Sequence, residues 1–187
     1  MRRIVSVYLA GPDLWFPDGQ GLIARKRELC EEAGFIGVSG RETATVEREP
    51  NEAMAREVYA DTLVRLRSCE AVIANLTPWR GAGCDPGAAF ECGFAAALGL
   101  PVFAYANLYS ADEADHRTRV ELMLGGGETD DGRLLDPDGC EVEDFGLPEA
   151  LMLWAEARTF AQVVTDAPWS DLSGFEACLE AMAEYAA

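Results

Sequence analysis

The sequence is poor in histidine and in positive charge. Among its 187 residues it has one histidine, His116, and its 15 Lys and Arg residues stand against 33 Asp and Glu, a formal net charge of −18. Zinc sites built on clustered histidines are therefore excluded, and a Ser-His catalytic pair could use only His116. A surface of this charge repels phosphate backbones and anionic lipid, so we expect no nucleic acid and no membrane as a partner.

Several sequence features of other protein classes are missing too. No apolar run reaches the length of a membrane span, and Gly11-Pro12-Asp13 ends the first apolar run too early for a signal peptide. No Gly-x-Gly-x-x-Gly follows a predicted strand and no Walker-type loop is present, so dinucleotide and phosphate-loop sites are not indicated. The 6 cysteines form no Cys-x-x-Cys pair. We interpret them as free thiols of a cytoplasmic protein.

Short apolar runs alternate with amphipathic segments along the chain. The runs predict buried parallel strands at 4–10, 35–38, 71–76 and 101–105. Helices are predicted at 22–33, 52–68, 85–99, 149–160 and 171–186. The polar, Gly- and Asp-rich residues 106–148 predict a loop or a small hairpin with an Asp-Gly turn. The whole chain, 1–187, is expected to form one domain of the α/β class, a doubly wound parallel sheet of about five strands flanked by helices. Ligands then bind at the carboxyl ends of the strands.

Glu91 is the most unusual charged residue of the chain. It lies in the second turn of the helix predicted from Asp85, in a stretch otherwise made of Gly, Ala, Phe and Cys. No basic residue lies three or four positions away, where an ion-pair partner on the same helix would be. The positive end of the helix is one turn away and favours an ionised carboxylate. Glu91 is therefore either a single exposed acid on a buried helix or a carboxylate aimed into a pocket, where it could act as a nucleophile.

Three aromatic residues lie near the end of the first predicted strand and in the loop that follows it. Tyr8 is either a core residue with a satisfied hydroxyl group or part of a site. Trp15 and Phe16 lie in the polar loop that follows. They either anchor this loop to the core or form a flat wall that stacks on a planar ligand.

Two further acids are candidates for the same site. Asp85 either simply caps its helix or also faces the pocket. Asp61 lies at the edge of the apolar stripe of the helix at 52–68, and its alternative role is an ion pair with Arg65 on the next turn.

Several segments resemble the nucleoside 2-deoxyribosyltransferases. They are VYLAGPDLWFPD at 7–18, AVIANLTPWRG at 71–81, DPGAAFECGFAAALGLPVFAY at 85–105 and VEDFGLPEALML at 142–153. The last segment resembles the C-terminal signature of the family. The similarity extends over most of residues 4–155 in the order of the family. Its most specific elements are an aromatic strand that leads into a Gly loop and an Asp six residues before the Glu of a helix.

The resemblance implies a flavodoxin-like fold and the transfer of 2-deoxyribose between nucleobases without a cofactor. By position, Glu91 matches the nucleophile of the family and Tyr8 the tyrosine that orients it. Asp85 matches an acid that holds the deoxyribose, and Asp61 an acid that handles the proton of the base. The remaining substrate-binding positions that the resemblance implies are Gly11, Trp15, Phe16 and Met152.

The same resemblance implies partners. These are a 2′-deoxynucleoside, a free nucleobase, and further copies of the chain in a homo-oligomer, at least a dimer with a shared active site. One position departs from the family pattern, because the Asn that a neighbouring subunit directs at the 5′-hydroxyl group of the sugar is Ala150 here. This change weakens the expectation of ordinary 5′-hydroxyl recognition.

Two other functions compete with transfer. One is hydrolysis of the N-glycosidic bond of a nucleoside or nucleoside 5′-monophosphate, with water as the acceptor. The net charge argues against a phosphate-bearing substrate, although Arg41, Arg48 or Arg80 could compensate for it locally. The other is a non-catalytic nucleoside-binding domain, against which the complete set of Tyr8, Asp85 and Glu91 argues.

Overall fold

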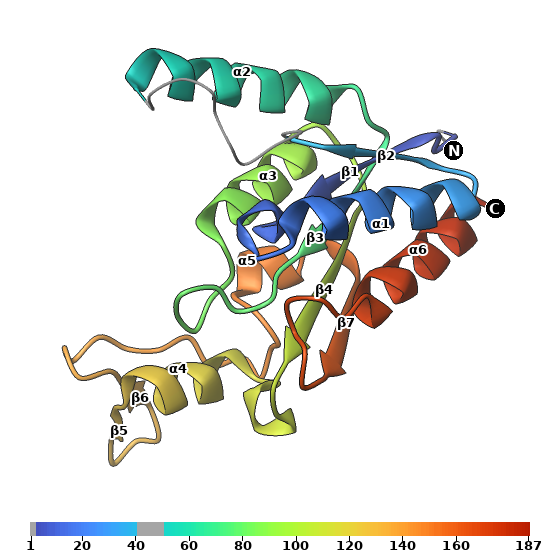
Figure 1. Cartoon of the computed structure of the whole chain (residues 1–187). Helices are drawn as coiled ribbons and strands as arrows, with labels where there is room; N and C mark the ends of the chain where they lie inside the picture. The colour runs from blue at the N-terminus through green and yellow to red at the C-terminus, as the bar shows by residue number, and fades with distance from the viewer. Residues whose placement is uncertain (1–2, 41–50) are drawn as a thin grey trace.

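A computed structural model of the protein describes residues 3–40 and 51–187. Its centre is a five-stranded sheet in which every neighbouring pair is parallel, in the order β2-β1-β3-β4-β7 (Figure 1). The strands are β1 (Ser6–Ala10), β2 (Ile36–Ser39), β3 (Ala71–Asn75), β4 (Val102–Leu108) and β7 (Ala157–Val164). The predicted α/β fold with a parallel sheet of about five strands is confirmed.

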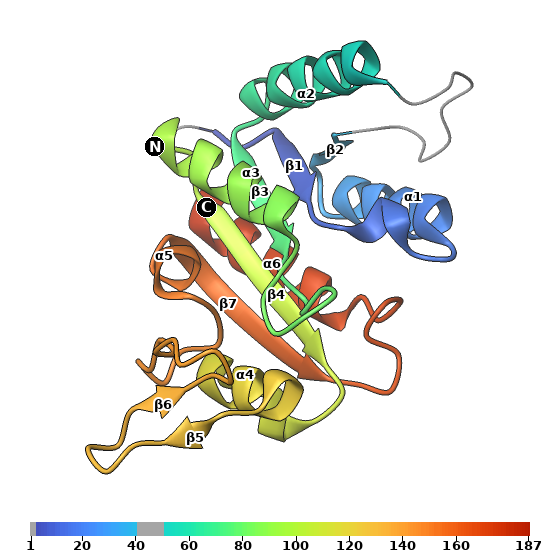
Figure 2. The ribbon, with the colours of Figure 1, turned by 90° about the vertical axis from the view of Figure 1, so that its left-hand side faces the viewer.

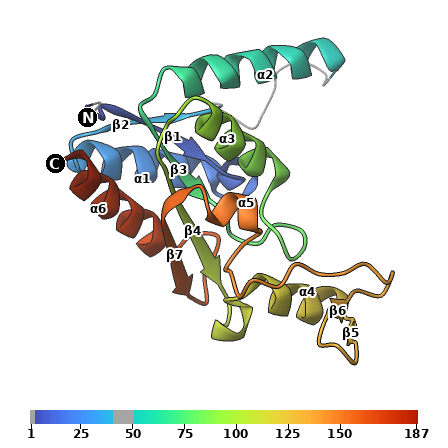
Figure 3. The ribbon, with the colours of Figure 1, turned by 180° about the vertical axis from the view of Figure 1, so that it is seen from behind.

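Helices cover both faces of this sheet. One face is covered by α1 (Gly19–Glu32) and α6 (Ser173–Ala186), and the other by α2 (Glu52–Arg67), α3 (Pro86–Ala97) and α5 (Leu151–Trp154) (Figures 2 and 3). Successive residues of β1 serve opposite layers, because side chains alternate along a strand. Val7 and Leu9 pack in the α1–α6 layer, whereas Tyr8 and Ala10 pack in the layer under α2 and α3.

The chain reverses its direction of winding at β1. It passes from β1 to β2 on one side of the sheet and then to β3 on the other side. The carboxyl ends of β1 and β3 therefore border a crevice that no crossover helix covers, and such a crevice is the usual ligand site of a doubly wound sheet.

The prediction of a helix over residues 149–160 is wrong. The structure has the four-residue helix α5 and then the edge strand β7, which pairs with β4. Arg158 and Gln162 of β7 are exposed, as is possible on an edge strand. These polar residues, with Thr159, interrupt the apolar sequence of β7, whereas the other strands were recognised by continuous apolar runs.

Residues 106–148 contain more regular structure than the predicted loop or hairpin. They hold the end of β4, the short helix η2 (Ala111–Glu113), the helix α4 (His116–Leu124) and a hairpin of β5 (Gly127–Glu128) and β6 (Leu134–Leu135). Helix α4 and the hairpin extend away from the layers of the sheet (Figure 1). Within the described residues, no helix has both the length and the apolar character needed to cross a bilayer.

Candidate active site

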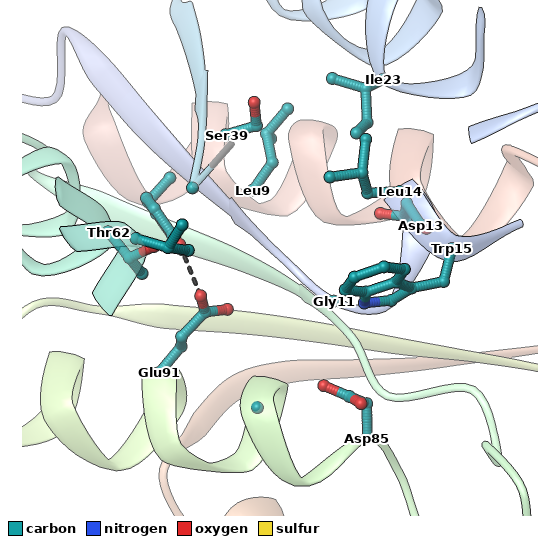
Figure 4. Close-up of a pocket in the computed structure, with 14 residues that line it drawn as sticks. Leu9, Gly11, Asp13, Leu14, Trp15, Ile23, Ser39, Thr62, Asp85 and Glu91 are labelled. Carbon is teal, nitrogen blue, oxygen red and sulfur yellow. Dashed lines mark hydrogen bonds between the residues drawn. The ribbon is translucent and has the colours of Figure 1, made fainter. Parts of the chain in front are cut away.

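A cavity of about 290 Å³ opens at the carboxyl end of β1, in the crevice where the winding reverses (Figure 4). Its walls come from the end of β1, the loop that follows, the end of β2, one side of α2 and the start of α3. Of the residues predicted for the site, this cavity is lined by Tyr8, Gly11, Trp15, Asp85 and Glu91.

The floor of the cavity is a hydrogen-bonded pair. The hydroxyl group of Tyr8, which is fully buried, donates to Oε1 of Glu91 over 2.5 Å. Burial, followed by the neighbouring Glu91 carboxylate, raises the pKa of Tyr8, which therefore stays a protonated donor. The pKa of Glu91 is raised to about 7, chiefly by burial and to a smaller extent by the nearby charge of Asp85. Hydrogen bonds from Tyr8 and from the Gly11 N–H act in the opposite direction.

Helix α3 can bring Glu91 within reach of Tyr8 because the other side chains on its inner face are small. Ala88, Cys92 and Ala95 are buried against the sheet, which lets the helix lie close to β3. Glu91 projects from α3 into the cavity (Figure 4), where its Oε1 accepts the hydrogen bond from Tyr8. The residue predicted as a lone acid on an apolar helix thus lines a cavity.

Asp85 begins α3 and also lines the cavity. Its Oδ2 accepts a hydrogen bond from the Ala88 N–H over 2.9 Å, and Pro86 occupies the first turn. A side chain at Gly87 would place its Cβ 2.7 Å from Oδ2 of Asp85, so glycine leaves this carboxylate its room. Asp85 therefore has both of the roles that its position allowed, as helix cap and as cavity wall.

Gly11 lets the backbone approach both Asn75 and Glu91 closely. Its φ of +142° is unfavourable for other residues, and a Cβ there would lie 2.7 Å from Cβ of Asn75. This close approach places the Gly11 N–H where it can hydrogen-bond to Glu91. The glycine after the first strand is thus required by the geometry of the site.

The two adjacent aromatic residues face different surroundings. Trp15 lines the cavity and is 56% exposed, whereas Phe16 is buried between Trp79 and Trp169, with ring centroids 5.5 and 5.0 Å away. Trp15 is the last residue of the short helix η1 (Asp13–Trp15), whereas Phe16 follows it in an extended conformation, so the two side chains point in different directions. Phe16 therefore anchors the loop to the core, which was one of its two expected roles, and it does not line this cavity.

Two other predicted residues lie outside the cavity of the chain that carries them. Asp61 pairs with Arg65 over 2.8 Å on the outer side of α2, and Val58 and Thr62 line the cavity instead. Met152 lies on α5 and is 81% exposed, so it contacts no part of this cavity within its own chain.

The structure adds Asp13, which the sequence analysis did not select. It lines the cavity yet is buried, with hydrogen bonds from Lys26 and from Asn75. The signal was an acid next to a Gly-Pro turn and followed by three apolar residues. The lysine that pairs with it is 13 residues away and gave no local pattern.

Cysteine chemistry is not indicated at this site. All 6 cysteines are free, as predicted. Cys84 lies just before α3 and Cys92 within it, and burial raises the pKa of each thiol to about 12. Both are therefore thiols at neutral pH and poor nucleophiles.

Comparisons with known proteins identify the family of this chain. Residues 7–152 match the family model described as nucleoside 2-deoxyribosyltransferase. An uncharacterized protein of Schizosaccharomyces pombe is 31% identical over 165 residues, which cover 81% of this chain and 76% of that protein. The structure of a 2-desoxiribosyltransferase from Leishmania mexicana is 26% identical, covers 94% of this chain and 97% of its own, and superposes with a TM-score of 0.63. The chain belongs to the nucleoside 2-deoxyribosyltransferase family.

Proposed function

We propose that this protein transfers 2-deoxyribose from a 2′-deoxynucleoside to a free nucleobase, through a covalent bond between the sugar and Glu91. The observation that carries the proposal is the contact of 2.5 Å between Tyr8 and Glu91 inside a cavity that Asp85 also lines. A buried carboxylate held by fixed donors is suited to act on a carbon that develops positive charge. The family and the match to the Leishmania mexicana enzyme support the same activity.

The chemistry follows from the carboxylate. Breaking the N-glycosidic bond develops oxocarbenium character at the anomeric carbon, which the ionised Glu91 stabilises from the opposite face and then captures as a glycosyl ester. The incoming base attacks the same carbon and expels Glu91, so the configuration is retained. A 2-deoxy sugar lacks the electron-withdrawing 2-hydroxyl group and forms the cation more readily, which favours deoxyribose over ribose.

The departing base must take up a proton, because an anionic purine or pyrimidine leaves poorly. The resemblance assigns this step to Asp61. In the structure, however, the carboxylate of Asp61 pairs with Arg65 outside the cavity. Substitution of Asp61 therefore tests whether this residue takes part in the reaction.

The charges of the cavity favour a nucleoside over a nucleotide. The charged residues among its described walls are Asp13, Asp85 and Glu91, all of them acids. A 5′-phosphate would meet repulsion there. Arg80 lies elsewhere, with its guanidinium group 4.7 Å from the centre of the Trp79 ring, and Arg41 and Arg48 lie outside the described residues.

The proposal includes a second copy of the chain. The expected substrate-binding residue Met152 and the neighbouring Ala150 belong to a segment at the surface, and Met152 reaches no part of the cavity of its own chain. Other apolar side chains of α3 and α5 are exposed as well, among them Phe90 and Trp154. A homo-oligomer in which one subunit brings Met152 to the cavity of another is consistent with both observations.

Incubation with deoxyinosine, with and without free adenine, tests the proposed function. Formation of deoxyadenosine that depends on adenine is the expected result. Release of free deoxyribose at the same rate without adenine would identify a hydrolase. Binding of deoxyinosine without any product would identify a nucleoside-binding domain.

A further inference from the structure

A buried ion pair lies behind the loop that forms one wall of the cavity. Nζ of Lys26, from α1, is 2.5 Å from Oδ2 of Asp13, in η1, and the two side chains are 2% and 5% exposed. Lys26 donates a second hydrogen bond over 2.7 Å to the hydroxyl group of Tyr105, in β4. Its ammonium group also lies 5.2 Å from the centre of the Phe175 ring. The lysine therefore crosses from a helix into the core in order to reach the loop.

The second oxygen of Asp13 is bound from another direction. Nδ2 of Asn75, the last residue of β3, donates to Oδ1 of Asp13 over 2.6 Å. Oδ1 of Asn75 accepts the N–H of Thr77 over 3.1 Å, so the amide is fixed as well. Both oxygens of Asp13 thus accept hydrogen bonds from the protein. We interpret the carboxylate as a group that holds the loop and not as one that binds a ligand.

This network holds the segment that carries two parts of the site. Asp13 lies two residues after Gly11, which lines the cavity and whose N–H lowers the pKa of Glu91, and two residues before Trp15, which also lines the cavity. Gly11 itself packs directly on Asn75. Lys26 and Asn75 therefore fix the loop from both sides of the bend.

We propose that Lys26, Asp13 and Asn75 are positioning residues of the transfer reaction. Through the carboxylate of Asp13 they hold the Gly11 N–H against Glu91 and the indole ring of Trp15 over the cavity. This inference rests on the proposed function, since it assigns the network to the same site.

The energetics of buried charges favour this role over simple stabilisation. A buried ion pair is often no better for stability than a well-packed apolar pair, because desolvation offsets the attraction. Loss of one partner, however, leaves a buried charge without compensation and is strongly destabilising. We expect the loop to shift so that the remaining charge reaches water or another partner. A displacement of about 1 Å at a site can lower a rate about a hundredfold, so the network matters most through geometry.

Four variants test the proposal. Asp13→Asn removes one of the two acceptors, and Lys26→Met removes the cation. The exchange D13N/N75D keeps every hydrogen bond: the amide at position 13 accepts from Lys26 and donates to the carboxylate at position 75, which still accepts from Thr77. Arg25→Met is the matched control, because Arg25 is an exposed cation of the same helix that pairs with Glu28 and Glu32.

The measurements are kcat per folded molecule, KM for the nucleobase, the binding constant for deoxyinosine and the pH dependence of the rate. In Asp13→Asn and Lys26→Met we expect kcat to fall at least about tenfold, with weaker binding of both ligands. The acidic limb should move to higher pH, because the Gly11 bond lowers the pKa of Glu91 while Tyr8 and Asp85, the other groups that face it, are unchanged. D13N/N75D should recover most of the wild-type values, and Arg25→Met should match wild type.

A purely structural role predicts a different result. The melting temperature would fall in Asp13→Asn and Lys26→Met, while kcat per folded molecule, KM, binding and the acidic limb would equal those of Arg25→Met. That outcome would overturn the inference, and so would a D13N/N75D variant that is folded but as inactive as Asp13→Asn. If both single variants fail to fold, Tyr105→Phe replaces them, since it removes only one acceptor from Lys26.

The proposed function is tested separately in the same experiment. Absence of transfer by the wild-type protein would contradict the proposed function, and the binding measurements would still decide the role of the network. Transfer by wild type, with Asp13→Asn indistinguishable from Arg25→Met, would overturn this inference alone.

Discussion

The hydroxyl group of Tyr8 lies 2.5 Å from Oε1 of Glu91, although the two residues are 83 positions apart in the chain. This contact joins the first strand to the helix that follows the third. Burial raises the pKa of Glu91 to about 7, so the carboxylate ionises near neutral pH and not near its usual value of 4.5. If the ionised form is the nucleophile, the rate should fall below about pH 7, and the groups around Glu91 should set where the fall occurs.

Tyr8→Phe should lower the rate and move the acidic limb to higher pH. The hydrogen bond from Tyr8 lowers the pKa of Glu91, so its loss raises that pKa. One hydrogen bond to a charged group contributes about 1.5–3 kcal/mol, or about ten- to a hundredfold in rate. The measurement is the pH profile of kcat/KM together with the melting temperature. Tyr59→Phe, on the exposed side of α2, is the matched control. A destabilised Tyr8→Phe variant with normal activity per folded molecule would show that the hydroxyl group is structural.

Asp85→Asn should shift the acidic limb in the opposite direction. The charge of Asp85 raises the pKa of Glu91, so its removal lowers that pKa. Asparagine caps helices about as well as aspartate, so the melting temperature should hardly change. The rate itself should fall if Asp85 holds the sugar. An acidic limb that stays in place would disprove the electrostatic coupling of the two acids.

Glu91→Gln should abolish turnover and stabilise the protein at alkaline pH. The folded-state pKa of Glu91, about 7, is raised above its usual value of 4.5, so the wild-type protein loses stability as the pH rises between these values. A neutral amide avoids that loss. Thermal melts should therefore place Glu91→Gln above wild type at pH 8, with the difference shrinking toward pH 5. An equal difference at both pH values would contradict the raised pKa.

Asp61→Asn separates the role implied by the resemblance from the position in the structure. Asp61 is exposed and paired with Arg65, and exposed ion pairs contribute about 0–1 kcal/mol. From this position we expect less than about a threefold change in kcat, and little change in stability. A fall of kcat by more than about tenfold, with normal melting, would instead show that Asp61 reaches the base during the reaction.

Local signals predicted the elements that carry the site. The bounds of α3 were predicted closely from Asp85, Pro86 and Gly99. Proline is favoured in the first turn of a helix and glycine just after its last turn, so this order marks a start and an end. The apolar run before Gly11 located β1 in the same way. Glu91 and Tyr8 were found because a charged and a phenolic group stood where the pattern required apolar ones.

The remaining features depended on information that no local pattern contains. Which of Trp15 and Phe16 faces the cavity is decided by one short turn, and whether Asp61 or Thr62 does is decided by a rotation of about 100° along α2. The pair of Asp13 and Lys26 is formed by the packing of a helix on a loop. Strand β7 was not predicted because polar residues interrupt its apolar sequence.

The most direct test of the account is to find the sugar on the protein. Wild-type protein mixed with a 2′-deoxynucleoside and no acceptor, quenched and digested, should carry one deoxyribosyl group on the peptide that contains Glu91. Free nucleobase should remove this adduct, and Glu91→Ala should not form it. An adduct on another residue, or transfer by Glu91→Ala at more than about 10% of the wild-type rate, would contradict the assignment of Glu91 as nucleophile.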